Sequence, residues 1–534
     1  SNAPSGVGSD ASSNGKSDVA TTLAVACSGC SAVDPNTYSG SGTGIWQASN
    51  NSTVPADLPI SIKGLAGQQV TLVFTNESSD AVAMPALQIQ SASQSATPLS
   101  KSQLEAAEPG DAWAGAKADI AEFNRSGFAR FLGARDKAAR KSLLPGEPSA
   151  VIAGYVVGDQ RSVYLSGGQH RTVRLQATGQ TSDGKTVNIW VEPSELSPGR
   201  VTGDMVNRLR DGFANAGGIY DMLVKAGGPL WGPHALGDWL IPGSGQPIDI
   251  FFVNFDQNAT PYGLVGYFWS LNNFRSDVLS DSNQSLSMYM DTETLYLDGE
   301  RGFMQVLTSL AHEGMHMQNY YRRGVLMGEA YTFDTWLEEM SAMMMEDWAS
   351  HSLDQGYNAM RDVRFPYYLS YRGNGSYNCS VTTWTPMGAS CESYAVNGSF
   401  GAYLNRQFGL DFFKSLLGST GIEDSRDILN AAIKARRPQS GTAQELRNFS
   451  AAAAGLVPAG AGVADYSMPG RSEDGLSLVG IDPAAFGASR RLPSAVPALL
   501  QPLASFPVSR SGVKGIYEET VRVPAGTSLT VVIN

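Results

Sequence analysis

Two histidines four residues apart, with a glutamate beside the first, stand out as residues that could do chemistry. They are His312, Glu313 and His316 in the segment "LTSLAHEGMHMQNYYRRG", in a chain of 534 residues with only five histidines. On a helix, both imidazoles project from one face and can share a metal ion. The glutamate of such an H-E-x-x-H arrangement acts as general base on a water beside the ion. The spacing therefore predicts a zinc site.

A zinc ion that takes part in catalysis has three protein ligands and keeps one position open. An extended pattern with a third histidine is absent, because residue 319 is Asn and residue 322 is Arg. We interpret the three remaining histidines as ordinary packed or surface residues: His170, His234 and His351. An acidic third ligand is therefore expected.

The next predicted helix, "FDTWLEEMSAMMMEDWAS", supplies several acidic candidates. Helical phase separates them, because apolar residues define the side that faces the core. Glu339 borders that side, one turn from Trp336 and Met343, and we predict it as the third ligand. The apolar side consists of Trp336, Leu337, Met340, Met343 and Met344, and the acidic candidates are Asp334, Glu338, Glu339, Glu346 and Asp347.

The other acidic residues of this helix receive different interpretations. Glu346 lies about two turns after Glu339 on the same flank, so it could accept a hydrogen bond from a ligand histidine. Asp347 falls in the middle of the apolar side, where it could orient a histidine or pair with another buried donor. Glu338 points away from that side and is interpreted as a solvated residue, and Asp334 as a helix cap.

The chain is too long for one hydrophobic core, and its patterns divide it into several parts. Residues 1–18 are expected to form a polar, disordered tail, and the first three residues resemble an expression scar. Residues 19–200 alternate apolar and polar residues between turns, which predicts a β-sandwich-like domain with a helical insert at 100–147. Residues 201–455 combine helices with buried strands and contain the metal motif. Residues 456–534 are rich in Pro and Gly and end in two strands, with packing on the N-terminal domain as one option.

Charge and hydropathy exclude some classes of partner. The net charge is −12 and the isoelectric point is about 5.0, so the protein repels phosphate backbones and we expect no nucleic-acid binding. No run of eighteen apolar residues occurs, so no membrane-spanning helix is predicted. We expect a monomer.

Four cysteines form two local pairs, Cys27 with Cys30 and Cys379 with Cys391. Four cysteines allow three connectivities, and adjacency favours the two short loops. A redox dithiol at the first pair is disfavoured, because no βαβ pattern surrounds it, so both pairs are interpreted as structural disulfides. Disulfides imply an oxidising compartment, so we expect an extracytoplasmic protein, secreted or held at the cell surface after removal of an export signal.

The segments around the metal motif resemble a known group of enzymes. "HEGMH" followed by the glutamate of "TWLEEMSAMMMED" resembles the glutamate-zincin peptidases, most closely the hyicolysin family of secreted bacterial metallopeptidases. "GLVGYFW" resembles the edge strand that holds their substrate, and the resemblance spans roughly residues 200 to 450. It implies a zinc endopeptidase with a thermolysin-like catalytic domain, within a multidomain α+β fold, that acts on proteins or peptides. Glu338 departs from the pattern, because many such enzymes have Asn there.

The resemblance also implies roles for residues outside the motif. Tyr394, in "SYAVNG", resembles the tyrosine that stabilises the oxyanion in related aminopeptidases, and a packed aromatic is the alternative. The strand from Gly263 to Trp269 would bind the substrate backbone by strand addition. Its substrate-binding residues would be Gly263 and Gly266, which allow close approach of that backbone, and Tyr267. One catalytic Zn²⁺ is implied, and calcium binding is left undecided, because no EF-hand loop occurs.

Two other functions remain open at this stage. The chain could be a surface adhesin or binding protein with a vestigial zincin domain, although binding alone does not need Glu313. It could also be a zinc aminopeptidase, but the "GLVGYFW" strand carries no acidic anchor for a free amine. An endopeptidase is therefore favoured.

Overall fold

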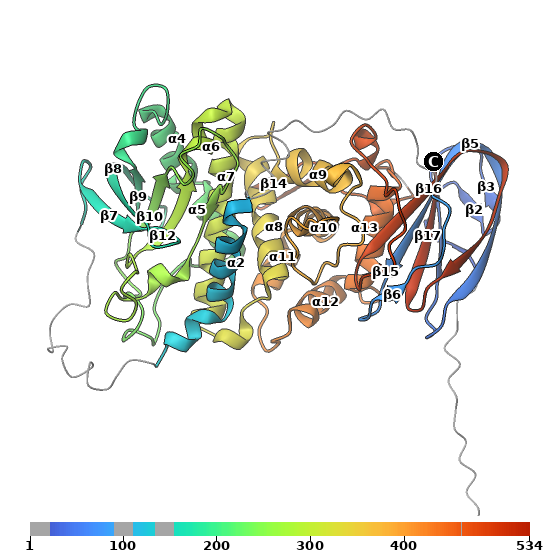
Figure 1. Ribbon diagram of the computed structural model, residues 1–534, viewed down its shortest axis with the longest axis horizontal. Helices are drawn as coiled ribbons and strands as arrows, with labels where there is room; N and C mark the ends of the chain where they lie inside the picture. The colour runs from blue at the N-terminus through green and yellow to red at the C-terminus, as the bar shows by residue number, and fades with distance from the viewer. Residues whose placement is uncertain (1–21, 90–110, 134–153, 461) are drawn as a thin grey trace, which may run out of the picture.

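The computed structural model describes residues 22–89, 111–133, 154–460 and 462–534. A β-sheet lies at each end of the molecule, and most of the helices lie between the two (Figure 1). The predicted tail at 1–18 and much of the predicted insert lie outside the described residues. None of the helices in the described ranges combines the length and the apolar character needed to cross a bilayer.

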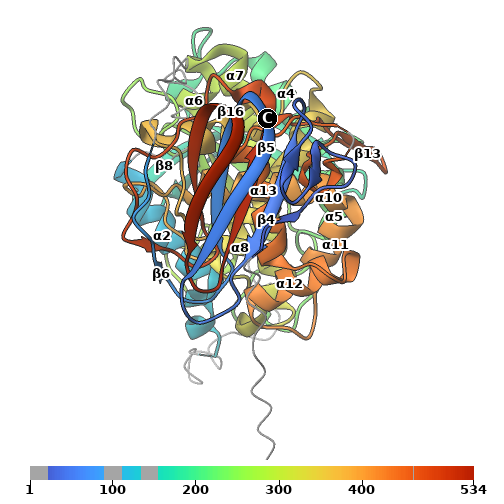
Figure 2. The same cartoon turned by 90° about the vertical axis from the view of Figure 1, so that its right-hand side faces the viewer.

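The first sheet joins strands from both ends of the chain. The long strand β5 pairs with β16 along nearly its whole length and with β17 along its last seven residues, and Figure 2 shows β5 and β16 side by side. Leu58 and Phe74, near opposite ends of β5, belong to one hydrophobic core, so the sheet folds back on itself. Gly64 and Gly67 lie at the bend with φ of 100° and 109°, a conformation that favours glycine. The strands are β1 (Ala24–Val25), β2 (Ala32–Asp34), β3 (Thr37–Tyr38), β4 (Gly44–Ser49), β5 (Ala56–Asn76), β16 (Ser505–Val523) and β17 (Thr527–Ile533).

The second sheet corrects the predicted boundary at residue 200. Its strand order is β11-β12-β10-β9-β8-β7, so strands from 160 to 191 belong with the metal-bearing part. Their alternation correctly predicts strands but does not identify the partner, because β9 pairs in parallel with β10, with Val187 opposite Ile248. The strands are β7 (Gln160–Tyr164), β8 (His170–Gln180), β9 (Thr186–Val191), β10 (Ile248–Val253), β11 (Gly266–Tyr267) and β12 (Leu286–Asp291).

The helices between the sheets hold the metal motif at their centre. Helix α7 packs against α8, α5 and β12, and α10 packs on the other side of α8. Close packing depends on Gly314, inside the metal motif, because a Cβ there would lie 2.5 Å from Leu223 Cδ1 of α5. The helices are α4 (Gly203–Ala214), α5 (Ile219–Gly227), α6 (Thr292–Leu297), α7 (Gly299–Asn319), α8 (Thr335–Leu353), α9 (Phe365–Ser370), α10 (Ser393–Phe408), α11 (Leu410–Leu417), α12 (Ser425–Arg436) and α13 (Thr442–Ala454).

An α-helix and a short 3-10 helix, η1 (Gly127–Phe131), of the predicted insert are described, and the α-helix lies away from the first sheet. Helix α2 (Asp111–Arg125) stands between the second sheet and α8 in Figure 1, and it contacts η3 (Ser270–Asn273), η4 (Tyr320–Val325) and α8. The insert therefore reaches the metal-bearing part of the molecule.

Candidate metal centre

The two histidines of α7 and one glutamate of α8 come together as the sequence predicts. One ligand atom from each of His312, His316 and Glu339 lies within 4.8 Å of the others. Glu339 Oε2 is 3.0 Å from His312 Nε2 and 3.5 Å from His316 Nε2. All three residues are buried. No other group of His, Cys, Asp and Glu in the described ranges converges in this way.

This donor set fits a zinc ion. Nitrogen and oxygen ligands lie 2.0–2.2 Å from zinc, so two of them at a tetrahedral angle are about 3.3 Å apart. The observed separations of 3.0 and 3.5 Å from Glu339 Oε2 bracket that value. Two imidazoles and a carboxylate are also the ligand types of a known class of catalytic zinc site.

Each histidine is held by a second carboxylate on its other nitrogen. His312 Nδ1 lies 3.0 Å from Glu346 Oε1, and His316 Nδ1 lies 2.9 Å from Glu338 Oε1. Asn319 donates from Nδ2 to both oxygens of Glu338, at 3.2 Å each. Such contacts fix the ring orientation and present both Nε2 atoms to the same point. Glu346 lies where helical phase predicts it.

The interpretation of Glu338 as a solvated residue is wrong. Its side chain is only 22% exposed and reaches His316 across the interface between α7 and α8. The apolar side of α8 indicates only where the hydrophobic core lies. Helix α7 packs against the neighbouring flank of α8, and Glu338 lies on that flank. Asn319 was not predicted either, although its place three residues after His316 on the same helix could have indicated it.

The carboxylates dominate the electrostatics of the group. Burial alone would lower the pKa of both histidines, but Glu339 and the other acids raise the pKa of His312 and hold that of His316 well above its usual value. Burial would raise the pKa of Glu339, yet His316 and His312 keep it well below its usual range. The site is therefore built to hold positive charge.

Glu313 lines the same cleft as two of the ligands. It is buried on α7, beside His316 and Glu339. Its Oε1 lies 3.8 Å from Lys117 Nζ of α2, and its Oε2 has no hydrogen-bond partner among the described residues. One carboxylate oxygen is thus available for proton transfer.

Tyr394 lies in the first turn of α10 and is buried close to the acids of the centre. Its ring packs edge-on against Trp384 at 4.7 Å, and Arg364 lies over it at 5.2 Å. Burial, then the charges of Glu339 and Glu313 among others, raise the pKa of its hydroxyl well above the usual value. The hydroxyl therefore stays protonated, and the residue also has the packing role foreseen as an alternative.

The predicted substrate strand is shorter than expected, and its glycines have other roles. Only Gly266 and Tyr267 are in β11, so Gly263 lies outside the strand. A Cβ on Gly263 would meet Asp256, and one on Gly266 would lie 2.7 Å from Met290 Sδ, so both glycines accommodate the protein's own packing. Tyr267 lines the cleft, but its ring stacks on a neighbouring tyrosine of β12.

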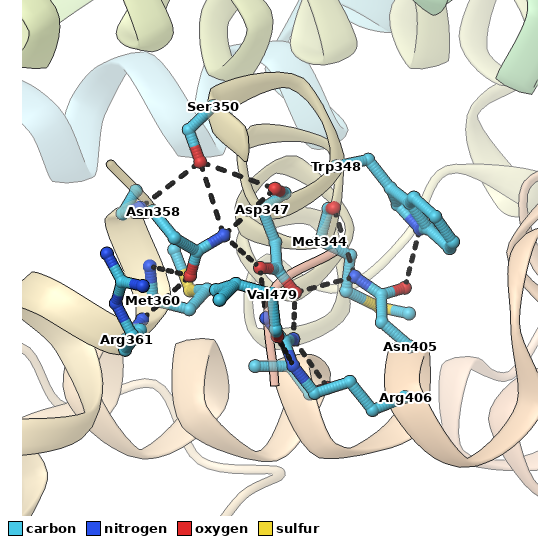
Figure 3. Close-up of polar contacts among 12 residues, drawn as sticks. Met344, Asp347, Trp348, Ser350, Asn358, Met360, Arg361, Asn405, Arg406 and Val479 are labelled. Atoms are coloured by element: carbon cyan, nitrogen blue, oxygen red, sulfur yellow. Dashed lines mark hydrogen bonds and ion pairs between the residues drawn. The ribbon is translucent and has the colours of Figure 1, made fainter. Parts of the chain in front are cut away.

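Asp347 does not contact a ligand histidine, which corrects that half of its interpretation. Figure 3 shows it facing α10, where Arg406 donates to its two carboxylate oxygens at 2.5 and 3.0 Å. Asn358 donates to Oδ1 at 2.8 Å and Asn405 to Oδ2 at 3.1 Å. The alternative prediction, that Asp347 pairs with another buried donor, agrees with these contacts.

The remaining predicted residues lie away from the centre. Both disulfides are present as predicted, Cys27–Cys30 and Cys379–Cys391. His234 is bonded through both ring nitrogens to the backbone, and His170 rests against an aromatic ring. His351 lies in the last turn of α8, outside the ligand group.

Comparisons with known proteins place the chain among peptidases. A family model described as Peptidase M30 matches residues 168–534, and a model described as a domain of unknown function (DUF8571) matches residues 25–89. Among solved structures, one similar chain is a two-domain M1 zinc metallopeptidase mutant bound to L-arginine, with 15% identity and a TM-score of 0.28 over 53% of this chain and 49% of that one. Another, bound to L-tryptophan, shows 12% identity and a TM-score of 0.26 over 54% and 50%. This chain thus spans about half the length of those structures. No curated protein matches it significantly.

Proposed function

The chain belongs to the peptidase M30 family, in agreement with the prediction of a zinc metallopeptidase, and from this premise we propose that it is a secreted zinc endopeptidase. One observation carries the proposal. Two imidazole Nε2 atoms and Glu339 Oε2 converge on one point, while separate carboxylates hold the two Nδ1 atoms. His312, His316 and Glu339 would hold the ion.

The surrounding residues have the chemistry that hydrolysis requires. Zinc, when bound, lowers the pKa of a water and polarises the scissile carbonyl. Glu313 takes the proton from the attacking water through Oε2 and passes it to the leaving amine. Tyr394 keeps its own proton, so its hydroxyl can donate a hydrogen bond to the oxyanion as negative charge develops.

The charges in the cleft favour an endopeptidase over an aminopeptidase. A free amine needs an uncommitted carboxylate, yet Glu338 is engaged by His316 and Asn319, and Glu339 by both histidines. A free amine would therefore bring a positive charge into the cleft with no free carboxylate to balance it. An internal peptide segment carries no such charge.

Other parts of the proposal rest on narrower observations. Two disulfides support an oxidising compartment, and hence secretion or display at the cell surface. The hyicolysin resemblance, the monomeric state and the lack of nucleic-acid binding stay predictions. A purely adhesive role is disfavoured, because Glu313 keeps an unpartnered oxygen in the cleft among the described residues.

The direct test measures zinc content and casein hydrolysis together. The purified protein should contain about one zinc per chain and digest casein. A chelator should abolish digestion and added zinc should restore it. Glu339→Ala should lose both zinc and activity. Full zinc content in Glu339→Ala, or digestion that survives metal removal, would refute the proposed site.

A further inference from the structure

Helix α2 covers the edge of the second sheet, where an extended peptide would be added. β11 is the last strand on that side of the sheet, and Lys117 of α2 bonds to its Gly266 where a further strand would pair. Figure 1 shows α2 beside α7 and α8, the helices that carry the predicted metal ligands. The cleft that contains Glu313, His316 and Glu339 is lined on its other side by Lys117, Ile120, Ala121 and Asn124 of α2.

Side chains of α2 form hydrogen bonds with polar backbone groups along this edge. Lys117 Nζ donates to the carbonyl of Gly266 at 3.1 Å, and Asn124 Nδ2 donates to the carbonyl of Phe268 at 2.9 Å. Asn124 Oδ1 also accepts from the amide of Ser270 at 2.7 Å. Gly266 lies in β11, Phe268 comes just after the strand and Ser270 begins η3, and α2 bonds to a backbone group of each. The opposite edge faces β12, to which Val265 bonds through its carbonyl.

Those groups are the ones a peptide substrate would use. A strand added to a sheet edge is held by hydrogen bonds to alternate backbone carbonyls and amides, while pockets select its side chains. Two side chains of α2 satisfy three of the groups in the way a bound backbone would. Lys117 also lies 3.8 Å from the carboxylate of Glu313, so it reaches the position of the general base.

We infer that α2 is a built-in competitor of the peptide substrate, which must leave the edge of β11 before an extended chain can bind there. The inference rests on the proposed endopeptidase function. It assigns α2 a regulatory role: the enzyme is latent while the helix is docked and becomes active when the helix is displaced.

Apolar contacts explain why the helix stays docked without substrate. Ile120 and Phe123 are buried, and the ring of Phe123 meets Trp269 and Phe274 edge-on at 6.2 and 6.1 Å. The polar contacts of Lys117 and Asn124 determine which part of the edge is covered. Changing these two residues should loosen the helix over β11 while its apolar anchors remain.

The test measures binding of fluorescein-labelled casein to the zinc-stripped full chain by fluorescence anisotropy. Lys117→Ala combined with Asn124→Asp should tighten binding about tenfold, a change of about 1.4 kcal/mol. The aspartate faces the carbonyl of Phe268 without a donor, so it disrupts the contact at nearly constant size. Lys117→Arg should bind as the unchanged protein does, because it keeps a donor for Gly266. Asp119→Ala, at an exposed position of the same helix, is the matched control and should change nothing.

The outcomes separate this inference from the proposed function. Unchanged or weaker casein binding in the double variant, with an unchanged melting temperature, would overturn the inference, because α2 would then be part of the substrate-binding site and not its competitor. Tighter binding without hydrolysis by the zinc-loaded double variant would refute the endopeptidase and leave the competition standing. Tighter binding with faster hydrolysis supports both.

Discussion

Two faces of helix α8 carry neighbouring acids into opposite surroundings. Glu346 faces α7 and holds the ring of His312, whereas the next residue, Asp347, faces α10 and is bound by Arg406. Both side chains are buried. The difference between them is the balance of charge around each.

We call the Asp347 face of α8 closed, because its buried charges are paired with one another. Each carboxylate oxygen receives a bond from the Arg406 guanidinium and another from Asn358 or Asn405, as Figure 3 shows. The α7 face is open: it gathers the carboxylates of Glu313, Glu338, Glu339 and Glu346, but Lys117 is the only lysine or arginine paired with any of them among the described residues. Buried carboxylates that outnumber their cations indicate a site for a cation, whereas a balanced pair indicates structure.

The largest effect is expected on the open face at Glu313. Glu313→Gln removes the base and should lower casein turnover by about 10²- to 10⁴-fold. Zinc content and the free energy of unfolding should stay unchanged, because the side chain is isosteric and its Oε2 lacks a partner among the described residues. Turnover and metal analysis of the same sample check this. Near-normal turnover would assign the base to another residue.

The second largest effect is expected on the closed face, where it changes the stability of the protein. Asp347→Ala leaves the Arg406 guanidinium buried without its partner, so the free energy of unfolding should fall by about 3–5 kcal/mol. Urea denaturation measures this. The zinc affinity of the folded fraction should not change. If Asp347→Ala instead releases zinc at full stability, the division between the two faces is wrong.

The third change examines α10, which contacts the closed face but brings Tyr394 near the open one. Tyr394→Phe should lower turnover by about 10²-fold if the hydroxyl stabilises the oxyanion. Zinc content should stay constant. The ring keeps its contacts with Trp384 and Arg364, so stability should change little. Unaltered kinetics would leave Tyr394 with its packing role alone.

The smallest effect is expected from the groups that orient the ligands. Glu346→Gln and Glu338→Gln should each weaken zinc binding by about 10- to 100-fold without abolishing it. A competition titration against a chromophoric chelator measures this, with Asp334→Asn at the exposed start of α8 as the control. If Glu338→Gln changed zinc affinity no more than the control does, Glu338 would have no role in orienting His316.

The local parts of the site could be predicted from sequence, because helical geometry fixes them. His312, Glu313 and His316 lie within two turns, and the phase of α8 is enough to favour Glu339 and Glu346. Phase failed for Glu338, because it describes one helix and not the position of the neighbour that packs on its flank. It could not separate the two possible partners of Asp347 for the same reason.

The long-range parts of the fold could not be predicted. The alternation within 160–191 identifies strands, but hydrogen bonding to β10 rather than to the first sheet depends on residues about sixty positions away. The docking of α2 beside β11 joins Asn124 to Phe268, the residue after the strand, 144 positions away. Nothing in the helical composition of the insert specifies that surface.

The pairing of β5 with β16 has a consequence for how the protein is made. Thr75 and Ser505 bond across this pair although they are 430 positions apart in the chain. A ribosome adding about 5–20 residues per second needs roughly 20 to 90 s to cover that distance. During this time β5 has been synthesised but has neither β16 nor β17 beside it, and an unpaired strand is prone to aggregation. The edges of β5 that later bind β16 and β17 therefore stay unpaired until the end of synthesis.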